Sequence, residues 1–371
     1  MPQLSRADTS TLGRWWWSVD RVTLMALAVL LGIGYVLALA ATPGLTDHIT
    51  DPHTLAMLKQ IVFLALSGLT MLGLSMLSLR QVKLAALGLG IVFYLLTAFT
   101  LLHGTEVDGA KRWLSLPGFT IQPSEFLRPA FIIIVAWCIA ESRRTPGFPG
   151  KRAALGVYLA TAALLKMQPD IGMTFLFTMV VLTELYLDGL EMKWLAVAGA
   201  LLVVAGVLAF LFIAHVHTRV MVFLDPPKGS QAQTALMAFG NGGMLGRGPG
   251  EGQVKHFLPD ARADFVFAVA GEEFGLFFCA FIILVFAAIV LRALVRLLAE
   301  PNLFVVLAGG GLVAGFGLQA FVNMASSLSL IPTKGMTLPL ISYGGSSALA
   351  ISTQMGFLLA LTRKRHAGDA A

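Results

Sequence analysis

Two aspartates four residues apart, Asp260 and Asp264, are the side chains best placed for acid–base or metal chemistry. They lie in a segment rich in glycine and charge, and Asp264 directly precedes the apolar run 265–270. If this segment is helical, the spacing puts both carboxylates on one face. Burial beside the apolar run would favour the neutral form of Asp264, whereas Arg262 or a bound cation would favour the charged form. Either state suits a general base or a metal ligand, although a lone loop aspartate is most often a solvated charge.

A second set of polar side chains stands at the ends of apolar segments or in the glycine-rich segment. It comprises Lys111, Arg112, Gln122, Glu125, Arg128, Lys166, Asp170, Lys255, Glu272, Glu273 and Lys334. A charge near the bilayer centre costs about 2.5–3.5 kcal/mol, so such groups tend to face a cavity and to pair. Glu125 and Arg128 are three residues apart and could pair on one helix face. A base about 4 Å from a phosphate gains on the order of 4 kcal/mol at an effective dielectric of 20. The bases therefore either line a site for a lipid pyrophosphate or only balance nearby acids.

Membrane helices must position these side chains. The chain has 371 residues, of which 57% are hydrophobic and 12% charged, against about 25% charged residues in soluble domains. Ten apolar runs approach the roughly 20 residues that cross a bilayer. They are 22–41, 56–77, 84–102, 126–139, 153–165, 171–187, 194–214, 274–295, 303–324 and 346–361. The sequence predicts an all-α polytopic membrane protein with about ten transmembrane helices and a large extracytoplasmic loop, about 216–273, between spans seven and eight.

The distribution of basic residues predicts the orientation. Fifteen of the 26 lysines and arginines fall in the tails and alternate loops on one side, which the positive-inside rule makes cytoplasmic. Both termini are then cytoplasmic, in a bacterial plasma membrane. Residues 1–20 form the N-terminal tail, 21–362 the membrane domain and 363–371 the C-terminal tail. The first 20 residues lack an early apolar region and are not expected to be a cleavable signal peptide.

Several chemistries are disfavoured by what the sequence lacks. The glycine-rich run 246–252 is followed by no βαβ unit, so no nucleotide cofactor is expected. The run 342–346 lacks the G-x-S-x-G pattern of a nucleophile elbow. The histidines lack zinc-ligand spacing. Cys138 and Cys279 both fall inside apolar runs, so no disulfide is expected.

Five sequence blocks resemble the SEDS family (shape, elongation, division, sporulation). They are 109–113 (GAKRW) with 122–125 (QPSE), 168–172 (QPDIG), Arg219 with Asp225 and Pro226, 257–265 (FLPDARADF), and 334–347 (KGMTLPLISYGGSS). The match spans about residues 20–361. Residues 332–339 (PTKGMTLP) are more similar to the cell-division member than to the elongation member.

The resemblance implies a ten-span peptidoglycan glycosyltransferase that polymerises lipid II on the outer face and uses no nucleotide. It also implies that the enzyme works at the septum with a class B penicillin-binding protein and other division proteins. Asp264 then corresponds to the family's catalytic aspartate. Lys111, Arg112, Gln122, Glu125, Arg128, Asp170, Lys255 and Lys334 are expected to bind substrate. A divalent cation, Mg²⁺ or Mn²⁺, is a possible cofactor with Asp264 as its ligand.

Two positions depart from the family pattern. Arg262 and Ala263 replace a His-Thr pair before the aspartate, and Arg128 stands where a lysine is usual, which keeps the charge but changes the hydrogen-bonding geometry. Three alternatives stay open: a lipid II flippase or transporter, an elongation-type polymerase, and a non-catalytic scaffold for division proteins.

Overall fold

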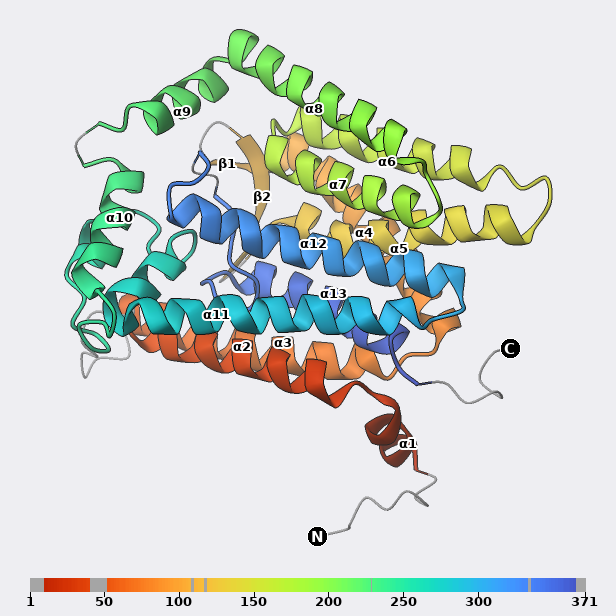
Figure 1. Cartoon of the computed structure of the whole chain (residues 1–371), viewed down its shortest axis with the longest axis horizontal. Coiled ribbons are helices and arrows are strands. Elements are labelled where there is room, and N and C mark those ends of the chain that lie inside the picture. The colour runs from red at the N-terminus through yellow and green to blue at the C-terminus, as the bar shows by residue number, and fades with distance from the viewer. Residues whose placement is uncertain are drawn as a thin grey trace.

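The chain folds into a bundle of long helices with a small sheet at one end (Figure 1). The computed structural model describes residues 10–40, 52–107, 110–116, 119–227, 229–332 and 335–364. The helices are α1 (Thr11–Ser18), α2 (Arg21–Ala40), α3 (Pro52–Ser75), α4 (Leu79–His103), α5 (Pro123–Arg144), α6 (Gly150–Met167), α7 (Ile171–Leu187), α8 (Met192–Phe212), α9 (Ala214–Leu224), α10 (Gln231–Gly242), α11 (Val266–Leu298), α12 (Leu303–Ser327) and α13 (Gly345–Leu361), with a short 3-10 helix at Val254–Phe257. The strands are β1 (Thr105–Val107), β2 (Ala110–Leu116) and β3 (Phe119–Ile121).

Each of the ten predicted apolar runs overlaps one helix along most of its length. In the described part of the chain, seven helices are long and apolar enough to cross a membrane: α2, α3, α4, α5, α8, α11 and α12. Helices α7 and α13 are apolar but shorter. The protein is therefore a multi-pass helical membrane protein, and the count of ten spans stays a prediction.

Helices α5, α12 and α13 form the centre of the bundle. Buried residues make up 72% of the most apolar stretch of α12 and 67% of that of α5, but none of that of α8. Helix α8 runs along the outside of the bundle (Figure 1), where its apolar surface is exposed as expected of a lipid-facing helix. Polar side chains on α5 and α12 consequently face protein rather than lipid.

The predicted loop 216–273 is largely structured. It contains most of α9, all of α10, the 3-10 helix and the first residues of α11, so Glu272 and Glu273 belong to a helix. Gly275 interrupts α11 with φ +80°, a conformation that glycine adopts without strain. A Cβ on Gly275 would lie 2.5 Å from the Met244 carbonyl oxygen, so the close approach of the two backbones also requires glycine.

The antiparallel sheet β1-β2-β3 was not predicted, because its strands are short and lie between two apolar runs. Lys111 on β2 stands opposite Glu106 on β1, a cross-strand pair of opposite charges. Successive side chains of a strand point to opposite faces. Lys111 and Arg112 therefore cannot face the same site.

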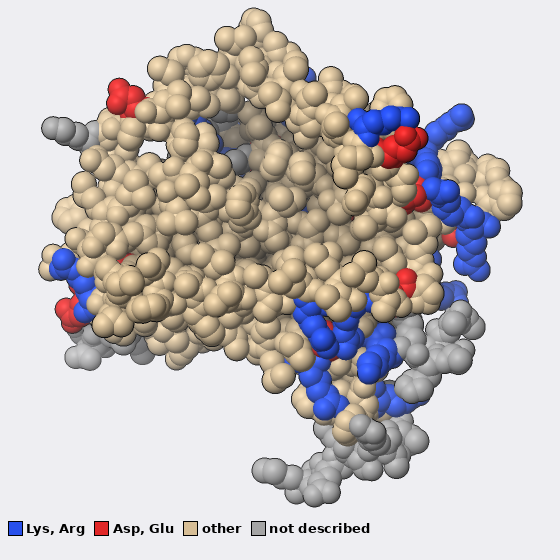
Figure 2. Space-filling view, viewed as in Figure 1, with Lys and Arg blue, Asp and Glu red and all other residues tan. Residues whose placement is uncertain are grey.

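Ion pairs and hydrogen bonds fasten the end of the bundle where α1 meets the end of α13. Buried Asp20 accepts Arg292 Nε at 3.1 Å and Arg296 Nε at 2.8 Å, and the Lys364 amide donates to the Ser18 carbonyl at 2.9 Å. Basic side chains gather at this end in the space-filling view (Figure 2). These arginines belong to the set predicted to be cytoplasmic, and the orientation itself stays a prediction.

A second cluster is built on Asp188, directly after α7. Arg143 Nε lies 2.9 Å from one carboxylate oxygen of Asp188 and Lys151 Nζ lies 2.6 Å from the other. Burial acts to raise the pKa of Asp188, but the hydrogen bonds and charges of Arg143 and Lys151 outweigh it and hold that pKa below its ordinary value. The cluster ties together the ends of α5, α6 and α7.

Candidate active site

A cavity of about 350 Å³ opens where the ends of α5, α7 and α12 meet the sheet and the start of α13. Two irregular segments, 260–264 and 335–344, complete its wall. Six of the predicted site residues line it: Arg112, Gln122, Glu125, Arg128, Asp170 and Asp264. Asp260 lines it as well. Arg112 and Asp264, which are far apart in the sequence, therefore share one cavity.

Arg128 supplies a buried positive charge to this cavity. Its side chain is only 2% exposed, and its Nε has no hydrogen-bond partner. Glu125 accepts a hydrogen bond from Ser346 Oγ at 3.2 Å, and within the described residues no direct ion pair joins it to Arg128. The predicted pairing of these two residues is thus only a longer-range attraction. A buried guanidinium with an unused donor is suited to an anionic ligand.

Arg112 is oriented by Asp170. Its Nη1 lies 3.4 Å from Asp170 Oδ2, and Gln122 Nε2 donates to the same oxygen at 3.3 Å. The other oxygen, Oδ1, accepts the Met173 amide at 3.1 Å and caps the N-terminus of α7, as aspartate commonly does. Asp170 therefore fixes the start of α7 and the position of Arg112 at once.

The backbone of Asp264 is held by α12. Asn323, which is 1% exposed, donates from Nδ2 to the Asp264 carbonyl at 2.8 Å and to the Met336 carbonyl at 2.6 Å. Gly335 lies against the side chain, since a Cβ there would stand 2.9 Å from Asp264 Oδ2. The carboxylate is thus half-buried, next to a position with no side chain.

Two further contacts join the segment that carries Asp264 to the segment before α13. Ser342 Oγ donates to the Ala263 carbonyl at 2.5 Å, and the Tyr343 amide donates to the Arg262 carbonyl at 2.8 Å. The Leu338 amide in turn donates to Ser342 Oγ at 2.7 Å. These hydrogen bonds hold the two segments, which are distant in sequence, together as one wall of the cavity.

The two aspartates share the cavity, as their spacing predicted. The Asp264 amide donates to the Asp260 carbonyl at 3.0 Å, which makes a single turn of backbone between them. Asp260 has φ +52°, a left-handed conformation that aspartate tolerates better than most residues. Asp260 is exposed whereas Asp264 is half-buried, so Asp264 has the drier environment.

Two of the predicted substrate contacts, Lys111 and Lys255, do not line the cavity. Lys111 is exposed on the face of β2 opposite Arg112. Lys255 is buried and its Nζ contacts Glu273 Oε1 at 2.5 Å and the Ala40 carbonyl at 2.7 Å. Its charge is already neutralised, so a direct substrate contact is not supported by its position. Lys334 lies outside the described residues.

Other lining residues were not predicted. Gln319 on α12 donates to the Thr337 carbonyl at 2.9 Å, and the Thr337 and Ser347 hydroxyls are 2.6 Å apart. Gln319 and Asn323 lie four residues apart in an otherwise apolar run. That pattern marks a polar face of a membrane helix and could have indicated both residues.

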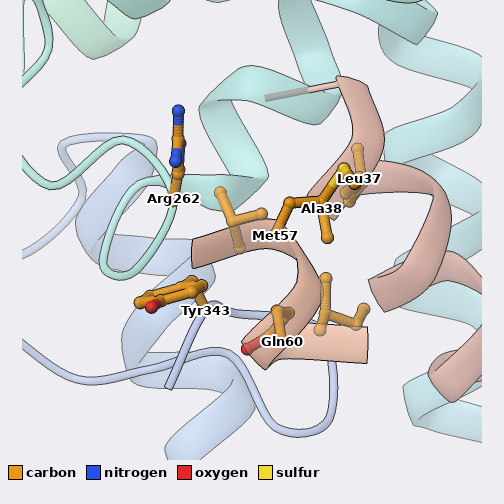
Figure 3. Close-up of a pocket in the computed structure, with 8 residues that line it drawn as sticks. Leu37, Ala38, Met57, Gln60, Arg262 and Tyr343 are labelled. Atoms are coloured by element: carbon orange, nitrogen blue, oxygen red, sulfur yellow. The ribbon is translucent and has the colours of Figure 1, made fainter. Parts of the chain in front are cut away.

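A second, much smaller pocket of about 10 Å³ lies behind the Asp264 segment, between α2 and α3. Its lining is mainly apolar, with Met57 and Gln60 from α3 beside Arg262 and Tyr343 (Figure 3). Tyr343 lines both pockets. Arg262, which departs from the family pattern, borders this pocket and not the larger one.

The donor set limits how a metal could bind. In the ranges that the structure describes, no group of three or more histidine, cysteine, aspartate or glutamate side chains is placed to hold an ion. Magnesium commonly binds through one or two carboxylates together with substrate phosphates. Asp264 fits this arrangement of carboxylate and phosphate ligands, in which a phosphorylated substrate would supply the remaining ligands.

Comparison with known proteins identifies the family. Residues 21–367 match the family described as cell cycle protein, FtsW/RodA/SpoVE. The chain is 41% identical to the probable peptidoglycan glycosyltransferase FtsW of Caulobacter vibrioides, over 97% of this chain and 93% of the relative. It is 32% identical to the protein of the same description from Alkalilimnicola ehrlichii, over 93% and 89%. The chain belongs to the FtsW/RodA/SpoVE family, which confirms the resemblance seen in its motifs.

Solved structures agree with this assignment. The fold is similar to a chain from a study titled "Structural coordination of polymerization and crosslinking by a peptidoglycan synthase complex", with a TM-score of 0.76 and 26% identity over 94% of this chain and 98% of that chain. It is also similar to the Thermus thermophilus rod shape determining protein RodA, with a TM-score of 0.69 and 26% identity over 94% and 97%. The helical bundle described above is thus the family fold.

Proposed function

We propose that this protein is a peptidoglycan glycosyltransferase that polymerises lipid II into glycan strands at the outer face of the plasma membrane during cell division. One observation carries the proposal: a half-buried carboxylate, Asp264, and a buried guanidinium with an unused donor, Arg128, line the same cavity. A base and an anion-binding group are the two parts that glycosyl transfer from a pyrophosphate donor needs. The names of the relatives support the same activity.

Asp264 acts as the general base in this mechanism. It accepts the proton of the C4 hydroxyl on the acceptor N-acetylglucosamine as that oxygen attacks C1 of the donor muramoyl sugar. The bond from C1 to the pyrophosphate oxygen breaks, and the configuration at C1 inverts. Asn323 holds the backbone of Asp264 and so keeps the carboxylate in place for this transfer.

The arginines stabilise the leaving group. Undecaprenyl pyrophosphate gains negative charge as it departs, and Arg128 and Arg112 provide donors that are fixed before the reaction begins. Such preorganised charge stabilises the transition state more effectively than mobile side chains. Asp170 and Gln122 orient Arg112 and need not touch the substrate.

A divalent cation could bind at one position in this mechanism, next to Asp264 and the leaving pyrophosphate. Asp264 would hold Mg²⁺ or Mn²⁺ together with pyrophosphate oxygens. When bound, such an ion supplies Lewis-acid stabilisation of the leaving group. The roles of base and metal ligand compete for the same carboxylate. A titration of polymerisation against each metal, with a chelator control, separates them.

The family supports a proposal for where the protein acts and for its partner. We place the chain in the bacterial inner membrane at the division septum, with both termini cytoplasmic and a class B penicillin-binding protein beside it to cross-link the product. A synthase complex among the similar structures supports a partner of this kind. Septal localisation of a fluorescent fusion, and co-purification with the penicillin-binding protein, test these two statements.

The decisive experiment is polymerisation of lipid II by the purified chain, with and without the penicillin-binding partner and divalent cations. Asp264→Asn should reduce glycan synthesis by about 10²–10⁴-fold, the usual contribution of a general base. Asp260→Asn is the matched control and should have a much smaller effect. Near-normal polymer from well-folded Asp264→Asn protein would exclude Asp264 as the base.

The same preparation distinguishes a polymerase from a transporter. A polymerase needs no membrane gradient, so detergent-solubilised protein should make glycan strands. A chain that makes no polymer under any condition but moves lipid II across sealed vesicles would instead be a flippase.

A further inference from the structure

An acidic side chain that the proposed mechanism does not use lies deep inside the bundle. Glu184 on α7 is 0% exposed. Neither of its carboxylate oxygens has a hydrogen-bond partner. An acceptor-only carboxylate without partners is rare in a protein interior, because each lost hydrogen bond and the lost hydration are costly.

The surroundings of Glu184 are tightly packed and apolar. A Cβ on Gly311 of α12 would lie 2.5 Å from Glu184 Oε1 and 2.7 Å from Cγ2 of Ile132 on α5. Gly311, and Gly310 beside Leu187, therefore let α12 approach α7 without side chains between them. This packing leaves no room beside Oε1 for a cation with its own ligand shell.

In the part of the chain that the structure describes, no ion pair joins a basic group to Glu184. Arg143 and Lys151 lie one helical turn further along, where both are bound to Asp188. The titratable side chain that faces Glu184 from α5 is Cys138, which is also partly buried. Along α12 the facing positions are glycines. Within the described residues, a negative charge on Glu184 would thus stand uncompensated.

We propose that Glu184 is a proton-binding site inside the membrane domain and that the folded protein holds it as a neutral carboxylic acid. A bound proton removes the charge that the surrounding apolar packing cannot accommodate. It also lets α5, α7 and α12 remain in close contact. The proton is in this sense a structural ligand of the three-helix junction.

The junction is mechanically linked to the cavity. Helix α7 begins at Asp170, which orients Arg112, and α12 carries Asn323, which holds Asp264. Gly311 and Asn323 are twelve residues apart, or about 18 Å along a helix. Loss of the proton would force α7 and α12 apart at one end and shift the two walls of the cavity at the other.

Infrared spectroscopy of the full chain in lipid tests the protonation state without any activity assay. The wild type should show the carbonyl stretch of a neutral carboxylic acid at neutral pH, and Glu184→Gln should remove it. Glu191→Gln, which removes an exposed carboxylate on the same side of the bundle, should leave that band in place. If Glu184→Gln instead removes bands of an ionised carboxylate, the proposal is overturned.

Thermal unfolding at neutral and alkaline pH provides the second measurement. Wild type and Glu191→Gln should lose Tm together as the pH rises and Glu184 gives up its proton. Glu184→Gln should keep the neutral-pH Tm and lose less on the alkaline side. Equal alkaline losses in all three proteins would refute the structural role. If Glu184→Gln cannot be purified, Glu184→Asp replaces it in the infrared experiment, where the neutral-acid band should shift rather than vanish. Neither readout depends on glycosyltransferase activity.

Discussion

Replacing Arg128 by glutamine should lower kcat/KM for lipid II polymerisation by about three orders of magnitude. The guanidinium is 2% exposed and keeps one donor unused, so a phosphate oxygen about 4 Å away would gain on the order of 4 kcal/mol at an effective dielectric of 20. At about 1.4 kcal/mol for each tenfold change in rate, that energy corresponds to about 10³. Arg112 is 21% exposed and already engaged by Asp170, so it can compensate only in part.

The assay is glycan synthesis from lipid II at several substrate concentrations, resolved by product length. Arg128→Lys keeps the charge but loses the planar fork and should fall between wild type and Arg128→Gln. Arg219→Gln removes an exposed charge on α9 and is the matched control, expected to have near-normal kinetics. Tm and monodispersity of each variant exclude misfolding. Kinetics within about threefold of wild type in folded Arg128→Gln, well short of the three decades expected from the Coulomb estimate, would refute an anion-binding role.

Three other outcomes follow from the geometry. Gly335→Ala should reduce kcat with little change in Tm, because the new methyl would lie 2.9 Å from Asp264 Oδ2; unchanged kcat would show that the carboxylate can move aside. Arg112→Gln should raise KM for lipid II far more than Lys111→Gln, since the two side chains point to opposite faces of β2; equal effects would contradict this strand geometry. Burial raises the pKa of Asp188, but Arg143 and Lys151 lower it by more, so this pKa is depressed in the folded chain. Stability is therefore full above the ordinary aspartate value of about 3.9 and falls as the pH drops through the folded pKa. Asp188→Asn should lower Tm at neutral pH and flatten that acidic decline, as measured by unfolding scans across pH.

The helices were predictable because membrane insertion imposes a strong pattern on sequence. Every one of the ten apolar runs overlaps a helix along most of its length, since each backbone polar group must be satisfied within the segment. The sheet and the structured 216–273 region were not predictable in the same way. They lie outside the apolar runs, where hydropathy carries no information about secondary structure.

The site was predictable in its residue types and less so in their contacts. Charges at the ends of apolar runs correctly indicated a shared cavity for Arg112, Arg128 and Asp264. Lys255 has the same sequence signal, yet it pairs with Glu273 inside the fold. Composition and spacing cannot distinguish a basic side chain that is available to bind a ligand from one that already pairs with an acidic residue of the protein.

The position of Asp264 depends on segments far away in the chain, and local sequence patterns do not show this. Two contacts that hold this part of the backbone come from α12 and from the segment before α13. Asn323 holds the Asp264 carbonyl, and Ser342 holds that of the preceding residue. Both contacts use backbone carbonyls as acceptors, so they constrain where the aspartate stands without consuming the oxygens that react. A catalytic base in a loop acquires the rigidity of the helices only through such contacts. Asn323→Asp, which is nearly isosteric but loses the amide donors, should accordingly reduce the turnover of lipid II polymerisation, because the unchanged Asp264 side chain is no longer held in position.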